Sequence, residues 1–98
     1  MPALCDVEVA AGLRRGMLRG AVSEERVVQA IEDYIDLPIA RHGHQGLLGH
    51  ILGLRENFSA YDATYVALTE QLGGELLTAD ERLARVARVH AHLAIASL

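Results

Sequence analysis

Residues 59–70 read SAYDATYVALTE, and residues 76–84 read LLTADERLA. Each stretch places an aspartate, Asp62 or Asp80, at the start of a predicted helix. Ser59 suits the N-cap of the first helix, because its hydroxyl can accept a hydrogen bond from a backbone N–H of the first turn. A compact apolar strand at 75–78 separates the two helices. A helix, a strand and a second helix in close succession indicate an α/β fold.

The rest of the chain continues this alternation of helices and short strands. Pro2 suits the first turn of a helix, and Gly20 suits its end. Ser23, followed by two glutamates, marks the start of a second helix. Because proline cannot serve a central ladder, we expect Leu37–Ala40 to be an edge strand. The expected helices are 2–19, 23–35, 45–54, 59–73 and 80–90, and the expected strands are 37–40, 75–78 and 92–97.

Length and composition indicate one small domain over residues 1–98, with 51% hydrophobic residues and no sign of disorder. The net charge of −4 provides no overall positive field, so an enzyme acting on nucleic acid would need local basic clusters or metal ions. The single cysteine, Cys5, cannot form an internal disulfide, which fits a reducing cytosol. The chain has no secretory signal at its start and no apolar run of ~18 residues. We therefore expect a cytoplasmic protein with no membrane-spanning segment.

Glu8 is the first of three candidate metal-binding carboxylates, the others being Asp62 and Asp80. On a helical projection Glu8 shares a narrow stripe with Gly12 and Arg15, and the positions one turn later offer it no ion pair. A solvated glutamate on an amphipathic helix is the structural alternative. Arg15 belongs to a small basic cluster beside Glu8, for which phosphate contact and ordinary solubilising charge are both open.

The two aspartates also have structural alternatives. Asp62 follows Ser59 by three residues, so helix capping alone could explain it. Asp80 projects onto the apolar face of its helix, near Ala84 and Ala87, where an unpaired charge would be costly. A divalent metal ion or a set of structural hydrogen bonds would satisfy it there. Mg²⁺ and Mn²⁺ prefer carboxylate and water oxygens, so converging acids would suit either ion.

Three segments together resemble the PIN-domain ribonucleases of the VapC toxin type. They are PALCDVEV at 2–9 with LRR at 13–15, LRENFSAYDA at 54–63, and LTAD at 77–80. Each short motif is weak alone, but the three occur in the family's order, and the match covers essentially the whole chain. The resemblance implies a PIN-like, three-layer α/β/α sandwich with a short parallel sheet.

The resemblance also implies roles for particular residues. Glu8, Asp62 and Asp80 match the second, third and fourth acids of a quartet that holds Mg²⁺ or Mn²⁺. Thr78 matches a polar residue that often lines the same site, and Arg15 is our candidate for contact with the substrate. The family's first aspartate lies on an opening strand well before the glutamate, and this sequence has no counterpart of it. We therefore expect an N-terminally incomplete PIN-like domain with an exposed sheet edge.

The first functional hypothesis is the toxin of a type II toxin–antitoxin system, a Mg²⁺/Mn²⁺-dependent endoribonuclease whose activity the incomplete N-terminus would impair. Its expected partners are RNA, a VapB-type antitoxin and a second copy of the chain. The alternative is a non-catalytic antitoxin-binding or interaction module derived from such a toxin. A third hypothesis is a small helical structural protein whose acids are only helix caps.

Overall fold

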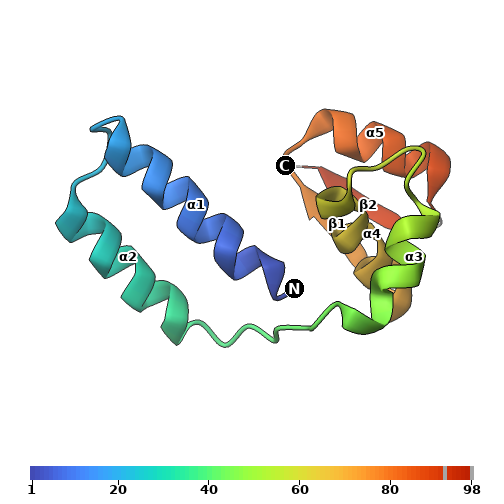
Figure 1. The fold of residues 1–98 in the computed structure, drawn as a ribbon, viewed down its shortest axis with the longest axis horizontal. Helices are drawn as coiled ribbons and strands as arrows, with labels where there is room; N and C mark the ends of the chain where they lie inside the picture. Colours follow the sequence, from blue (N-terminus) through green and yellow to red (C-terminus); the bar gives the residue numbers. More distant parts are fainter. Residues whose placement is uncertain (92, 98) are drawn as a thin grey trace. The chain divides into compact units, whose positions relative to one another are not determined.

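The computed structural model describes residues 1–91 and 93–97, which form two compact units (Figure 1). The first unit consists of residues 1 and 3–42, and the second consists of residue 2 and the chain from residue 43 onward. Along the chain, two helices come first, and three further helices and two strands follow a 3₁₀ turn. Each unit is described below by itself.

The first unit is a hairpin of α1 (Leu4–Leu18) and α2 (Glu24–Asp36), which run side by side in opposite directions (Figure 1). Gly20 ends the first helix with a φ of 73°, a left-handed conformation that costs glycine little. Ser23 caps α2 by accepting a hydrogen bond from the backbone N–H of Arg26, at 3.3 Å. The predicted ends of both helices are confirmed to within a few residues, although α1 begins at Leu4 rather than at Pro2.

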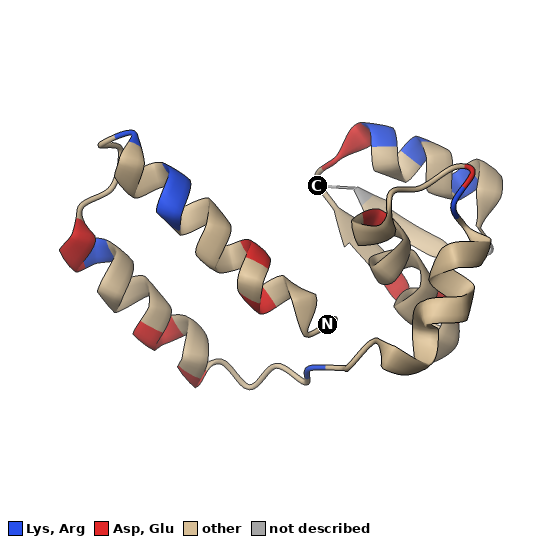
Figure 2. Cartoon of the chain, viewed as in Figure 1, with Lys and Arg blue, Asp and Glu red and all other residues tan. Residues whose placement is uncertain are grey.

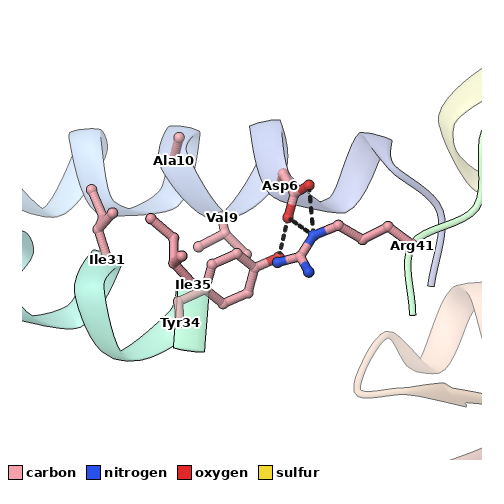
Figure 3. A pocket seen from close by; sticks show the side chains of 7 residues that line it. All are labelled: Asp6, Val9, Ala10, Ile31, Tyr34, Ile35 and Arg41. Atoms are coloured by element: carbon pink, nitrogen blue, oxygen red, sulfur yellow. Dashed lines mark hydrogen bonds and ion pairs between the residues drawn. The ribbon is translucent and has the colours of Figure 1, made fainter. Parts of the chain in front are cut away.

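A polar cluster ties the open end of this hairpin together. The Asp6 carboxylate accepts a hydrogen bond of 2.6 Å from the Tyr34 hydroxyl. Arg41 Nε donates to both carboxylate oxygens of Asp6 at 2.9 Å, and its guanidinium lies 5.4 Å from the centroid of the Tyr34 ring. The three side chains form one end of a pocket whose other lining residues, all apolar, are Val9, Ala10, Ile31 and Ile35 (Figure 3).

The expected edge strand at Leu37–Ala40 is wrong, because this segment has no regular secondary structure. Leu37 donates its backbone N–H to Tyr34 O at 3.2 Å, and Ile39 donates back to Leu37 O at 2.9 Å. Pro38 has no N–H to donate. The segment therefore has few backbone N–H groups left that could donate hydrogen bonds to a neighbouring strand. The chain start pairs with the end of this segment and just beyond it: Met1 N donates to Ala40 O, and His42 donates to Met1 O and accepts from Ala3, each at 2.8 Å.

The second unit contains a short 3₁₀ turn (Gln45–Leu47), α3 (Leu48–Gly53), α4 (Ala60–Leu72), β1 (Glu75–Thr78), α5 (Glu81–His90) and β2 (Ala94–Ser97). The two strands are parallel, with Glu75 opposite Ala94 and Leu77 opposite Ala96. Because parallel strands need a crossover, α5 connects them as a β–α–β unit and contacts both. The expected strand at 75–78 is confirmed, and so is the last strand over the described residues 94–97. Residue 92 lies outside the described residues.

Helices α4 and α5 both pack on β1 and enclose the core of the second unit. Ala63, Val66 and Ala67 on α4 and Ala87 on α5 are completely buried. Small side chains at these positions let the helix backbones approach the sheet closely. The other buried members of this core are Leu47, Ile51, Phe58, Leu68, Leu76 and Leu83.

The expected α/β class with a short parallel sheet is confirmed. The three-layer sandwich and the single domain over residues 1–98 stay predictions. In the parts of the chain that the structure describes, no helix combines the length and apolar character needed to cross a membrane.

The Asp6 cluster predicts a pH effect on the first unit. The hydrogen bond from Tyr34, followed by that from Arg41, lowers the pKa of Asp6 below its ordinary value of 3.8. Since this pKa is lowered in the folded state, its contribution to stability is present above pH 3.8 and is lost as the pH falls through the folded value. Replacing the hydroxyl, by Tyr34→Phe, should raise the pKa of Asp6 toward 3.8, as followed by the carboxyl ¹³C shift.

Tyr61→Phe is the matched control, because it removes the hydroxyl of an exposed tyrosine in the second unit. It should leave the titration of Asp6 unchanged. An unchanged Asp6 titration in Tyr34→Phe would contradict the hydrogen bond as the main cause.

Candidate functional site

Asp62 lies in the first turn of α4, where the local sequence positions its backbone firmly. Ser59 is the N-cap and accepts a hydrogen bond of 3.1 Å from the Asp62 backbone N–H. The helix N-terminus carries a partial positive charge, which favours a carboxylate at this position. The Asp62 side chain is half-buried, with 26% of its surface exposed. The capping serine was expected from the sequence and is confirmed.

Asp80 lies between the end of β1 and the start of α5, and it is the N-cap of that helix. Its Oδ1 accepts a hydrogen bond of 3.0 Å from the backbone N–H of Leu83. Its own backbone N–H donates to Thr78 Oγ1, also at 3.0 Å. Thr78 and Asp80 thus form one local unit at the C-terminal end of a parallel strand, the edge at which open α/β sheets bind ligands.

The expectation that Asp80 points to the apolar side of its helix is wrong. A helical projection assumes helical dihedral angles, but Asp80 has φ −83° and ψ 103°, which are extended values. Its side chain is 49% exposed, so it carries no charge into the core. The structural hydrogen bond considered for it is present, and it engages only one of the two carboxylate oxygens.

Arg82 brings the two aspartates together. Its Nη2 donates to Asp62 Oδ2 at 2.9 Å and lies 3.8 Å from Asp80 Oδ2. The two carboxylates therefore come from different helices and face one cation. The sequence analysis did not identify Arg82, because its contact with Asp62 spans 20 residues and joins two helices. An arginine two residues after an N-cap aspartate was the available signal.

Glu8 and Arg15 belong to the first unit, on α1. Both are exposed, and the Arg15 guanidinium lies 3.7 Å from the point where a Cβ on Gly12 would stand. Arg15 therefore lies beside Gly12 on the same helix. The convergence of Glu8 with the two aspartates, and the substrate contacts of Arg15 and Thr78, stay predictions.

The Asp62–Asp80 pair has the donor chemistry of a site for a hard divalent cation. Both side chains offer anionic oxygens, and the guanidinium of Arg82 already occupies the position of a cation between them. Within residues 1–91 and 93–97, no cluster of three or more histidine, cysteine, aspartate or glutamate side chains could hold a metal ion. The described site is thus a pair of carboxylates, and carboxylate oxygens are ligands of the type that Mg²⁺ and Mn²⁺ prefer.

Charge on α5 is unevenly distributed around this pair. The helix begins with acidic residues and carries basic residues along the rest of its length (Figure 2). Arg82, Arg85 and Arg88 recur every three residues and are all exposed. In a chain of net charge −4, this helix is a local basic region beside an acidic pair, which the net charge alone did not indicate.

Fold and site together define an α/β protein with an acidic pair at the C-terminal end of a parallel strand. Comparison with known proteins makes this class more specific. The chain is 42% identical over 83 residues to ribonuclease VapC9 of Mycobacterium tuberculosis H37Rv, an alignment covering 85% of this chain and 65% of that protein. It is also 42% identical over 84 residues to ribonuclease VapC3 of the same organism, covering 86% of this chain and 61% of VapC3. A VapC ribonuclease of Mycobacterium bovis matches with the same figures as VapC9.

Several VapC ribonucleases that are 42% identical over about 85% of this chain support its placement among the VapC-type PIN-domain ribonucleases. The chain spans less than two thirds of the length of the relatives quoted above. No family model and no solved structure matches it.

The N-cap role of Asp80 predicts a difference between two substitutions. Asp80→Ala removes the bond to Leu83 N and should lower the free energy of unfolding by about 1 kcal/mol. Asp80→Asn keeps an oxygen at that position, and asparagine is an equally good N-cap, so the loss should be only a few tenths of a kcal/mol. Urea unfolding followed by circular dichroism measures both.

Ser59→Ala is the matched control, because it removes the corresponding cap from α4. It should cost about as much as Asp80→Ala. Equal losses for Asp80→Ala and Asp80→Asn would contradict the capping role of the Asp80 oxygen.

Proposed function

We propose that this chain is the toxin component of a type II toxin–antitoxin system, a Mg²⁺- or Mn²⁺-dependent endoribonuclease that cleaves phosphodiester bonds in RNA. The observation that carries the proposal is the meeting of Asp62 and Asp80 at one cation. Two acids that the family resemblance singled out, 18 positions apart in sequence, lie at one place in the fold. The similarity to ribonucleases VapC9 and VapC3 supports the reaction class.

In this proposal Asp62 and Asp80 hold the metal ion. The family resemblance makes Glu8 a third candidate ligand. A bound divalent ion would lower the pKa of a coordinated water and stabilise negative charge on the phosphate that is attacked. The capping bond to Leu83 N orients Asp80, leaving its Oδ2 directed to the cation position. The hydrogen bond from the Asp80 backbone N–H to Thr78 Oγ1 holds Thr78 against the same loop. Arg15 would contribute a phosphate contact, as expected for an exposed cation near Glu8.

The proposed partners are an RNA substrate, a VapB-type antitoxin and a second copy of the chain. The names of the relatives support the RNA and the antitoxin. The proposed location is the cytoplasm, where RNA and a protein antitoxin are both available.

A non-catalytic interaction module is the second candidate, and the first unit favours it. Val27 is the buried hydrophobic residue of the α1–α2 hairpin, whereas Val7, Leu18 and Ile35 are each at least 65% exposed. The hairpin also holds an open pocket of about 500 Å³ with mainly apolar walls (Figure 3). An open pocket with mainly apolar walls would suit an apolar side chain of a partner protein. Such a module would not need the metal ion.

RNA cleavage by the complete 98-residue chain tests the first candidate. End-labelled RNA is incubated with the protein in Mn²⁺, in Mg²⁺ and in EDTA, beside Asp80→Asn and Asp62→Asn. We expect metal-dependent cleavage that either substitution reduces at least ~100-fold, because each removes a charged metal ligand. Asp80→Asn is an informative control, since it keeps the helix cap and therefore the fold.

Two results would contradict the proposal. Cleavage that continues in EDTA, or that survives both substitutions, would show that these acids do not carry the reaction. A folded chain that neither cleaves RNA nor binds Mn²⁺ would favour the interaction module instead.

A further inference from the structure

We propose that Arg82 is a built-in competitor of the metal ion: its guanidinium occupies the cation position between Asp62 and Asp80 and must move away when a divalent ion binds. This inference rests on the proposed metal site and adds a regulating residue to it. It concerns the affinity of the site for its ion.

The same oxygen atoms would serve both cations. Arg82 Nη2 contacts Asp62 Oδ2 at 2.9 Å and faces Asp80 Oδ2 at 3.8 Å. The other oxygen of Asp80, Oδ1, accepts the hydrogen bond from the backbone N–H of Leu83. The oxygen of Asp80 that remains for a metal ion is therefore the one that already faces Arg82.

Charge makes simultaneous binding unfavourable. A divalent ion about 2.1 Å from Asp62 Oδ2 would lie within ~5 Å of Arg82 Nη2, because that nitrogen is 2.9 Å from the same oxygen. Even in a water-like dielectric, the repulsion between a double and a single positive charge at ~5 Å corresponds to roughly a ten-fold loss of affinity. Arg82 must therefore leave its place or weaken the binding of the ion.

The structure also lets the arginine leave. The Arg82 side chain is 56% exposed, and an exposed ion pair of this kind contributes little stability. The backbone of Asp62 is held by α4, and Asp80 is held by its capping bond, so both acids keep their places in the fold when Arg82 moves. Because Arg82 binds the two acids only weakly, it lowers the metal affinity of the site without abolishing it.

Mn²⁺ binding to the complete chain tests this inference. The concentration of free Mn²⁺ is read from its electron paramagnetic resonance signal during a titration at low ionic strength. We expect Arg82→Gln to bind Mn²⁺ about three- to ten-fold more tightly than the unsubstituted chain, because a competing charge is removed. The Mn²⁺-induced rise in melting temperature should be correspondingly larger in Arg82→Gln.

Two matched variants separate charge from structure. Arg82→Lys keeps the positive charge and should stay within about two-fold of the unsubstituted affinity. Arg85→Gln removes the same charge one turn further along α5, and it should also change the affinity less than about two-fold, since water and salt screen the longer distance. Arg82→Met keeps a long side chain without charge and replaces the glutamine variant if that variant does not fold.

The outcomes for this inference and for the proposed function can be told apart. Equal or weaker Mn²⁺ binding by Arg82→Gln, with binding that Asp80→Asn abolishes, would overturn the role of Arg82 and leave the metal site standing. Mn²⁺ binding that neither Asp62→Asn nor Asp80→Asn affects, or no binding in any variant, would overturn the metal site together with the competitor. Tighter binding in Arg82→Gln and in Arg82→Met, but not in Arg82→Lys, supports the inference.

Discussion

The hydrogen bond from Leu83 N to Asp80 Oδ1 is the interaction on which the site depends. It fixes where β1 gives way to α5, because Asp80 closes the first turn of the helix as soon as the strand has ended. The start of α5 in turn determines the position of Arg82, two residues later. A helix that began one residue earlier or later would rotate Arg82 by about 100° and take it away from Asp62.

The packing of α4 and α5 on β1 in the second unit holds the residues of this site in place. Completely buried alanines on α4 and α5 allow both helices to lie close to β1, and Val66 on α4 is completely buried in the same core. The two helix N-termini are thereby held near the same end of the strand, where their partial positive charges favour acidic side chains. Helix capping and the helix dipole already favour acidic side chains at these positions. A shared catalytic role is therefore not needed to explain why both acids lie there. The shared position opposite one guanidinium is the feature that capping alone does not explain.

The two units differ in how much of their apolar surface is buried. The second unit contains nearly all of the buried hydrophobic residues, whereas α1 has none and α2 has Val27 alone. In the first unit, the hydrogen bond and the ion pair of Asp6 with Tyr34 and Arg41 link α1, α2 and the segment after α2. The resulting hairpin has the exposed apolar character of a surface that binds another protein, as the toxin and the interaction-module hypotheses both require.

The sequence by itself determined the elements that local rules govern. Serine caps, glycine ends and apolar runs predicted the five helices and the strands at 75–78 and 92–97, the latter observed over the described residues 94–97. Capping and hydrophobic period are read within a few residues. Prediction from the sequence failed at Leu37–Ala40, where the N–H groups of Leu37 and Ile39 found partners nearby. Only the tertiary structure brought Arg82 to Asp62, since that contact spans 20 residues and depends on how α4 and α5 pack on β1.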